Sequence, residues 1–113
     1  MHEYSIVQAL LNQCEEHAQQ HEATEVTKVI CKIGVLSGVE IALLQVAFDT
    51  FKEGTICERA ELILNKQKLK LECKECANVF EVDEVRYFCD KCESLKVKVL
   101  EGEDMYLMSL EMK

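Results

Sequence analysis

Two pairs of cysteines lie at a spacing that is typical of a zinc site. Each pair has the form C-x2-C, and twelve residues separate Cys73 and Cys76 from Cys89 and Cys92. A C-x2-C turn points two sulfurs at one metal, and two such turns complete the tetrahedral shell that Zn²⁺ takes in structural sites. No histidine lies inside this segment, so its ligand set consists of the four thiolates. We therefore predict structural zinc, in preference to an iron–sulfur cluster or a redox-active dithiol.

Met1, His2 and Glu3 offer donors for a different kind of metal site. A free α-amine, the His2 backbone nitrogen and the His2 imidazole can close adjacent chelate rings around one ion. Deprotonated amide nitrogen is a strong-field donor that suits square-planar or tetragonal Ni(II) or Cu(II), and Glu3 adds a carboxylate and a second amide nitrogen. We expect Met1 to be retained because the bulky His2 hinders its removal by aminopeptidases. A lone histidine near a chain terminus usually has no role, so these residues alone leave the site open.

Two further histidines form a rival metal-binding pair. His17 and His21 are four residues apart, a spacing at which two imidazoles on one helix can share a metal ion. No carboxylate completes a convincing ligand set around them. We therefore expect both histidines to be exposed side chains near the end of a helix.

Three cysteines remain outside the paired motif. Cys14 and Cys31 lie on apolar faces of their predicted elements, and we expect them to be buried as small hydrophobic residues. Cys57 is the candidate for an exposed thiol, and no neighbouring residue identifies it as a nucleophile. We therefore expect core or bystander thiols here, not a further site.

The apolar residues follow two different periods along the chain. A period of 3.6 predicts a helix over residues 4–20, with an apolar face of Val7, Leu10, Leu11, Cys14 and Ala18. Residues 37–40 have the S-x-x-E form of a capping box, which predicts that a second helix opens there and ends before Gly54. Alternation of apolar and polar residues predicts strands near 26–35, 60–64, 69–71, 95–99 and 106–112.

This order of elements predicts an α+β fold, in which two helices pack on a small mixed β-sheet and a zinc-ribbon sub-domain is attached. We expect residues 1–70 and 95–113 to form the α+β domain that carries the N-terminal metal donors. Residues 71–94 are expected to form the zinc ribbon. A segment of about 25 residues cannot bury enough core to fold alone, so the ribbon should depend on its metal.

The charge balance is acidic, with 21 Asp and Glu residues against 13 Lys and Arg residues and a net charge of −8. Phosphate contacts rely on Lys and Arg, so this charge disfavours a nucleic-acid-binding protein. The first residues lack the basic and apolar regions of a secretory signal, and no apolar run is long enough for a membrane span. We expect a cytoplasmic protein whose thiols stay reduced and which has no membrane or nucleic-acid partner.

Three stretches of the chain together resemble one known family. They are Met1-His2-Glu3 at the start of the first helix, Ile33-Gly34 with Leu36-Ser37-Gly38-Val39 before the second helix, and the paired C-x2-C module. This combination resembles the HypA/HybF family, whose members incorporate nickel during the maturation of NiFe hydrogenase, and some of which also serve urease. The resemblance covers the whole chain, including its length and its order of elements.

The resemblance implies particular ligands and partners. It implies a nickel site formed by the Met1 amine, the His2 and Glu3 backbone nitrogens and the His2 side chain, and a structural zinc ion at the four paired cysteines. It implies a nickel-binding maturation GTPase and the hydrogenase large-subunit precursor as partners, with a urease accessory protein where urease is also served. Asn78 and Glu93 stand where some relatives have histidines beside the cysteine pairs, so exchange of zinc ligands with pH or nickel is not predicted.

The leading hypothesis is a nickel metallochaperone that is not an enzyme and that delivers Ni(II) from its N-terminus during hydrogenase maturation. The alternative is a zinc-ribbon adaptor in transcription or translation without a nickel role, which the acidic charge disfavours. A C-x2-C thiol oxidoreductase ranks last. Metal analysis separates the first two hypotheses, because one zinc plus one nickel ion per chain favours the metallochaperone and zinc alone favours the adaptor.

Overall fold

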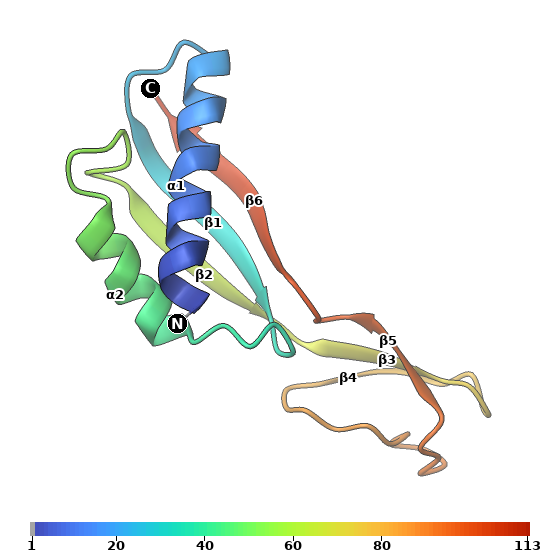
Figure 1. Ribbon diagram of the computed structural model, residues 1–113. Helices are drawn as coiled ribbons and strands as arrows, with labels where there is room; N and C mark the ends of the chain where they lie inside the picture. Colours follow the sequence, from blue (N-terminus) through green and yellow to red (C-terminus); the bar gives the residue numbers. More distant parts are fainter. Residues whose placement is uncertain (1) are drawn as a thin grey trace. The chain divides into compact units, whose positions relative to one another are not determined.

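The computed structural model describes residues 2–113, which form two helices and six strands (Figure 1). In chain order the elements are α1 (His2–Gln20), β1 (Val26–Gly34), α2 (Ile41–Phe51), β2 (Glu61–Gln67), β3 (Leu69–Cys73), β4 (Val79–Val82), β5 (Val97–Glu101) and β6 (Met105–Met112). The predicted α+β class is confirmed, since the two helices accompany two small sheets. Among residues 2–113, neither helix combines the length and the apolar character that a membrane crossing needs.

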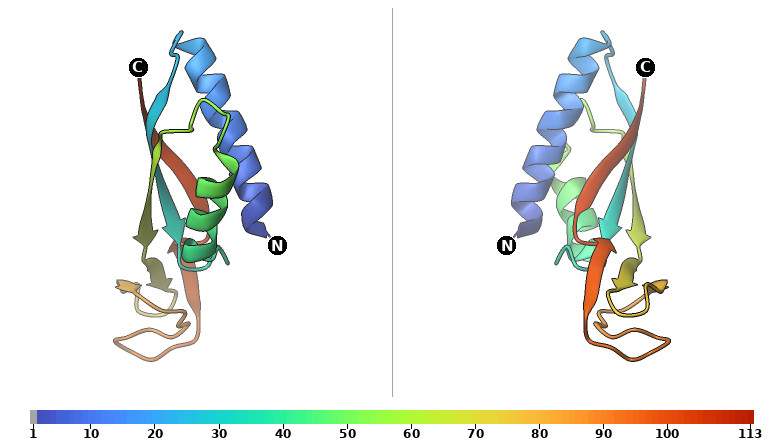
Figure 2. Two further views of the ribbon diagram at one scale, coloured as in Figure 1. Left: turned by 90° about the vertical axis from the view of Figure 1, so that its left-hand side faces the viewer. Right: turned by 90° about the vertical axis from the view of Figure 1, so that its right-hand side faces the viewer.

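The first sheet has the strand order β2-β1-β6 and is mixed. The Val26 N–H donates to the Ile56 carbonyl over 3.0 Å and the Val35 N–H donates to the Gln67 carbonyl over 3.1 Å, so β1 and β2 run in the same direction. Strands β1 and β6 run antiparallel. The Thr24 N–H donates to the Lys113 carbonyl beyond one end of the pair, and the Gly34 N–H donates to the Asp104 carbonyl at the other. Parallel neighbours need a crossover connection, and α2 lies within it. Both helices cover the same face of this sheet (Figure 2).

The main core lies between that face and the helices. The face predicted for α1 is buried at all five positions, which are Val7, Leu10, Leu11, Cys14 and Ala18. Helix α2 adds Leu44 and Phe48, which are fully buried. Burying a large apolar side chain contributes about 1.5–3 kcal/mol, so this packing fixes where the N-terminal helix lies.

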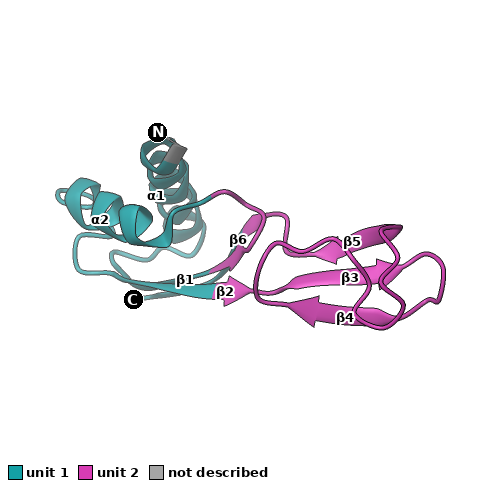
Figure 3. Ribbon diagram, turned by 90° about the horizontal axis from the view of Figure 1, so that it is seen from below, with its two compact units in different colours: residues 1–31, 39–65, 106–113 teal, residues 32–38, 66–105 magenta. Residues whose placement is uncertain are grey.

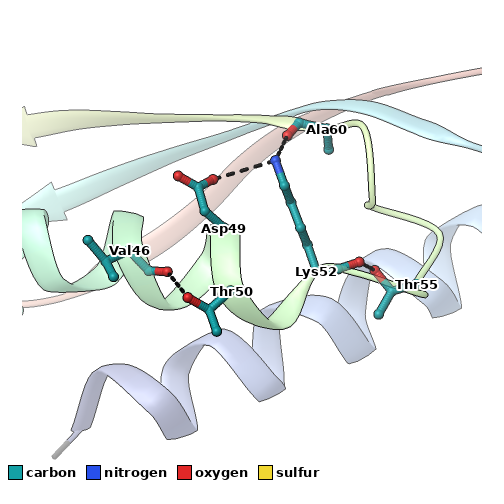
Figure 4. Close-up of polar contacts among 6 residues, drawn as sticks. All are labelled: Val46, Asp49, Thr50, Lys52, Thr55 and Ala60. Carbon is teal, nitrogen blue, oxygen red and sulfur yellow. Dashed lines mark hydrogen bonds and ion pairs between the residues drawn. The ribbon is translucent and has the colours of Figure 1, made fainter.

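A polar cluster holds the end of α2 against the segment that leads into β2 (Figure 4). The Lys52 ammonium donates to the Ala60 carbonyl over 3.1 Å and lies 3.5 Å from the Asp49 carboxylate. The same ammonium lies 5.6 Å from the centroid of the Phe48 ring, a cation–π distance. The half-buried Lys52 ammonium therefore connects the end of α2 to the segment before β2.

The beginning of α2 differs from the prediction. The prediction of a capping box at residues 37–40 is wrong. The helix begins at Ile41, and its N-cap residue, Glu40, makes no side-chain capping bond. The segment before it is a turn, in which the Ser37 N–H donates to the Gly34 carbonyl over 3.0 Å and Gly38 takes a φ of 75°. A positive φ at Gly38 is incompatible with a right-handed helix, so the S-x-x-E pattern occurs here without its usual structure.

The second sheet has the order β4-β3-β5 and is antiparallel throughout. Leu71 at its centre faces Phe80 on β4 and Val99 on β5. Its buried cluster is small and consists of Leu69, Leu71, Cys73, Phe80, Val82 and Cys89. Two of the six residues, Cys73 and Cys89, belong to the paired motif, whereas Cys76 and Cys92 are exposed. Half of the candidate zinc ligands are therefore part of this core.

Gly34 and Gly102 allow two backbone segments to approach each other closely. A Cβ atom on Gly34 would lie 2.4 Å from the Gly102 carbonyl oxygen, which no side chain could tolerate. Gly102 has a φ of 107°, and a Cβ there would lie 2.9 Å from the Leu69 Cα atom. Both positions therefore require glycine.

The chain divides into two compact units (Figure 3). Unit 1 consists of residues 1–31, 39–65 and 106–113, and unit 2 consists of residues 32–38 and 66–105. Unit 2 is larger than the ribbon of residues 71–94 expected from the sequence. The added residues include the first two residues of β3 and all of β5, because β3 pairs with β4 on one side and with β5 on the other.

Candidate metal sites

The four paired cysteines converge on one point in unit 2. Their Sγ atoms all lie within 4.8 Å of one another, and the Cys73–Cys92 and Cys76–Cys89 separations are each 3.6 Å. Four sulfurs at about 2.3 Å from a tetrahedral Zn²⁺ ion lie about 3.8 Å apart. The arrangement therefore fits zinc closely, and Cys73, Cys76, Cys89 and Cys92 can hold a structural ion.

The two C-x2-C turns have the same backbone structure. In the first, the Cys73 N–H donates to the carbonyl five residues ahead over 2.8 Å, and the Cys73 carbonyl accepts from the Ala77 N–H over 2.9 Å. In the second, Cys89 makes the equivalent bonds over 2.9 Å, the latter with Glu93. Ala77 and Glu93 each take a φ of 62°, which is unusual for residues other than glycine. Each turn is thus held in an uncommon conformation that points both of its sulfurs the same way.

Backbone amides stabilise the thiolate form of the leading cysteine in each turn. The Cys76 N–H points at the Cys73 sulfur over 3.4 Å, and this bond lowers the pKa of Cys73. Around Cys89, desolvation raises the pKa, but N–H groups of Cys92 and Lys91 at 3.4 Å outweigh it and lower the pKa to about 6. Cys73 and Cys89 are therefore prepared for the thiolate form before a metal binds, whereas the pKa values of Cys76 and Cys92 are raised.

Asn78 supports the same cluster from outside it. Its side-chain amide donates to the Asp90 carboxylate over 2.7 Å and lies 3.7 Å from the Cys89 sulfur, which contributes to the lowered pKa of Cys89. The family resemblance drew attention to Asn78 only because some relatives have histidine there. It did not predict that the Asn78 side chain would contact a cysteine sulfur. Glu93, the other such position, serves in the turn through its backbone.

The N-terminal donors are described only in part. Met1 lies outside the described residues, and for His2 the structure gives the backbone, which begins α1. Glu3 is buried, with 6% of its surface exposed, and its carboxylate accepts a hydrogen bond from the Glu40 N–H over 3.1 Å. That carboxylate thus satisfies a backbone donor at the N-cap of α2, where negative charge is favoured by the helix dipole. The nickel site at Met1, His2 and Glu3 stays a prediction.

Sequence reasoning missed this role of the Glu3 side chain, because its partner is 37 residues away in the chain. The contact joins the first turn of α1 to the start of α2. It therefore fixes the position of the chain segment that carries the predicted nickel donors.

An apolar hollow of about 270 Å³ adjoins Glu3 between the two helices. Its other lining residues are Tyr4, Leu43, Val46, Ala47, Thr50 and Phe51. The Tyr4 and Phe51 rings meet edge to face with centroids 4.5 Å apart. Val46 is 63% exposed and Leu43 is 46% exposed, so large apolar side chains are open to solvent beside the predicted nickel donors.

The remaining cysteines lie in the core of unit 1. Cys14 and Cys31 are buried as predicted, and burial raises the pKa of Cys31 to about 11. The expectation of an exposed thiol at Cys57 is wrong, because this residue is fully buried. It shares a hydrogen bond with the Cys14 thiol, which raises the pKa of Cys14 and lowers that of Cys57. Cys14 and Cys57 are far apart in the chain, so the local sequence around Cys57 does not reveal this contact.

Comparison with known proteins extends over the whole chain. Residues 1–112 match the family described as "Hydrogenase/urease nickel incorporation, metallochaperone, hypA". The hydrogenase maturation factor HypA of Aquifex aeolicus is 51% identical over 112 residues, which cover 99% of this chain and 97% of the relative. The same factor from Helicobacter hepaticus is 39% identical over 114 residues, with 99% and 97% of the two chains covered.

Solved structures agree with this assignment. A solution structure of HypA protein is 41% identical, covers 100% of this chain and 97% of its own, and has a TM-score of 0.75. The solution structure of the Ni metallochaperone HypA from Helicobacter pylori is 39% identical, with 97% and 96% covered and a TM-score of 0.70. The four-cysteine cluster, the Met-His-Glu start and the match over the whole length point the same way: the chain belongs to the HypA family of hydrogenase and urease nickel-incorporation metallochaperones.

Proposed function

We propose that this protein carries Ni(II) on a chelate formed by its first three residues and delivers the ion during NiFe-hydrogenase maturation. Its family membership makes it a nickel metallochaperone of hydrogenase maturation, and the whole-length family match is the observation that carries this function. The proposal adds the ligand set, the mode of transfer and the partners.

The proposed nickel ligands are the Met1 amine, the His2 and Glu3 backbone nitrogens and the His2 imidazole. Helix geometry supports this set, since His2 and Glu3 lie in the first turn of α1. The first four N–H groups of a helix have no intrahelical partner, so deprotonating two of them for a metal breaks no helical hydrogen bond. The Glu3 carboxylate, which is bonded to the Glu40 N–H, then positions this chelate and is not itself a ligand.

The proposed mode of transfer follows from the position of the chelate in the first three residues of the chain. An incoming ligand can displace the amine, the imidazole and the amides one at a time, without unfolding of the carrier. The Irving–Williams order gives such a site a higher affinity for Cu(II) than for Ni(II), so selectivity must come from metal availability and from the docked partner.

The zinc ion is assigned a structural role, and the protein is proposed not to be an enzyme. Four thiolates close the shell of the ion and leave no position for a substrate or an activated water. Cys73, Cys76, Cys89 and Cys92 would each supply one bond. What the bound ion supplies is cohesion between the two C-x2-C turns in a small core.

The proposed partners are a nickel-binding maturation GTPase and the hydrogenase large-subunit precursor, with a urease accessory protein where urease is also served. Membership in the family places the chain with the hydrogenase maturation machinery. The exposed apolar residues beside Glu3 support direct contact near the chelate. A cytoplasmic location is part of the proposal, because unpaired thiols and zinc thiolates persist in a reducing compartment.

A nickel titration of two histidine variants tests the proposed ligands. His2→Ala removes the imidazole of the chelate and should abolish tight binding, whereas His17→Ala is a matched control that should bind nickel as the parent protein does. Equilibrium dialysis with zinc-loaded protein measures both. Equal nickel affinity of His2→Ala and the parent protein would show that the chelate is misassigned.

A further inference from the structure

The two histidines that nickel binding leaves unused lie beside methionines of another element. His17 is in the last turn of α1, and His21 follows it one helical turn later. Together with Leu107–Leu110 and Met112 they line a surface hollow of about 300 Å³. Within residues 2–113, neither imidazole makes a side-chain hydrogen bond or an ion pair. Two nitrogen donors are thus available next to the thioether sulfurs of Met108 and Met112.

Met112 is the sulfur donor that is best placed for both imidazoles. Met108 and Met112 are four positions apart on β6, which separates their backbones by about 13 Å, so one ion cannot use both. Met112 also lines the adjoining hollow with His21, whereas Met108 does not. It is half-buried, which restricts its side chain, while Met108 is 52% exposed.

The chemistry of these donors selects a soft cation. Imidazole nitrogen and thioether sulfur are neutral, and thioether sulfur prefers Cu(I) over hard divalent ions. Two carboxylates, Glu22 and Glu111, line the adjoining hollow with Lys113, and Lys28 pairs with Glu111 over 3.9 Å. Nearby charge is therefore close to balanced, and the neutral donors themselves set the preference. We propose that His17, His21 and Met112 form a second metal site in unit 1, which binds a soft monovalent cation, Cu(I) or its analogue Ag(I).

This site is separate from the proposed nickel chelate and does not depend on it. His2 and His17 are fifteen positions apart on α1, which corresponds to about 22 Å along the helix axis. Unit 1 would then hold two metal sites of opposite preference, with amide nitrogen for Ni(II) at one end of α1 and imidazole and thioether for a soft ion at the other.

A silver titration followed by NMR tests the proposal. Ag(I) is used because it is diamagnetic and stays in one oxidation state, and the protein is zinc-loaded and labelled at its methionine methyl groups. With Ag(I) added up to two equivalents, we expect the Met112 methyl and the imidazoles of His17 and His21 to shift, while Met105 at the other end of β6 stays unchanged. A zinc indicator in the sample reports any attack on the thiolates.

Two leucine variants provide the matched comparison, because Met→Leu conserves volume and should leave the fold intact. Met112→Leu should weaken silver binding at this site at least tenfold, and Met105→Leu should leave it unchanged. Two results would each overturn the proposal: silver that only displaces zinc while the Met112 methyl does not move, or equal silver affinity in the two variants. Neither result bears on nickel binding at the N-terminus.

Discussion

The two compact units of the chain differ in charge and in how they offer metal donors. Unit 1 has eleven acidic and four basic residues, a formal charge of −7, whereas unit 2 has ten acidic and nine basic residues, a charge of −1. Unit 1 offers its proposed nickel donors at a chain end, whereas unit 2 brings four sulfurs together, two of them buried in its core. An acidic surface raises the local concentration of cations. The comparison separates a metal that is delivered from a metal that is kept.

The units also differ in what holds them together. Unit 1 packs two helices on a sheet, and its fully buried residues include Val7, Val29, Leu44 and Phe48. Unit 2 has few buried apolar residues, while Val85, Tyr87 and Leu95 are each about half exposed or more. Unit 1 can therefore be stable through apolar burial alone, and unit 2 should need its metal.

The largest expected effect is the loss of unit 2 when its zinc site is broken. Structural zinc contributes about 10–16 kcal/mol of apparent binding energy in small zinc domains, so Cys89→Ser should abolish stoichiometric zinc and unfold β3, β4 and β5. Hydrogen exchange should then show unprotected amides in 66–105 and retained protection in α1 and β1. Cys31→Ala is the matched cysteine control and should keep its zinc. Retained protection of β3 in Cys89→Ser would contradict the inference that unit 2, unlike unit 1, needs its metal to stay folded.

Removal of the Glu3 anchor should affect unit 1 alone. Glu3→Ala leaves the Glu40 N–H without this acceptor, and loss of a hydrogen bond to a charged group costs about 1.5–3 kcal/mol. Glu3→Gln keeps an acceptor oxygen and should cost less. Denaturant unfolding measures both, with Glu16→Ala as an exposed control and zinc content unchanged in all three. A loss in Glu3→Ala no larger than in Glu16→Ala would contradict the structural role of Glu3.

Loss of Lys52 should produce a smaller change in the same unit. Lys52→Met keeps the apolar stem of the side chain but removes the bond to Ala60 and the pair with Asp49. A single polar contact of this kind contributes about 1 kcal/mol, so the free energy of unfolding should fall by about that amount. Lys28→Met, at an exposed ion pair with Glu111, should change it less. Equal effects of the two substitutions would argue against a special role of Lys52.

The smallest effect concerns the pH at which unit 2 loses zinc. The pKa of Cys89 is lowered to about 6, so its stabilising contribution is fully present above the usual thiol pKa and is lost as pH falls through about 6. Asn78→Ala removes one of the donors that lower this pKa, so acid-induced release of zinc should begin at a higher pH. A zinc indicator measures the midpoint, with Asn65→Ala as an exposed control. A midpoint that stays the same or moves to lower pH would show that Asn78 does not assist Cys89.

Local patterns predicted the features that depend on neighbouring residues. The C-x2-C spacing sufficed for the four-sulfur cluster, because each turn is closed by bonds within a few residues of Cys73 or Cys89. The apolar face of α1 followed from its period for the same reason.

Long-range contacts were out of reach of such patterns. The Glu3–Glu40 bond, the burial of Cys57 and the position of Met112 beside His21 each join residues that are far apart in sequence. The capping-box prediction failed where the turn through Gly38, with its positive φ, overrode a matching local sequence. Where a residue had two plausible roles, contacts between distant parts of the chain determined which role it takes, and its sequence neighbours did not.

The separation of a delivered nickel ion from a retained zinc ion is tested most directly by extending each end of the chain. A Gly-Ser extension before Met1 removes the free α-amine from the chelate, and the same extension after Lys113 is the matched control. Both proteins are exposed to nickel, dialysed and analysed for the two metals. We predict one zinc ion per chain in both, with one nickel ion in the C-terminally extended protein and none in the N-terminally extended one. Equal nickel in the two proteins would contradict the account.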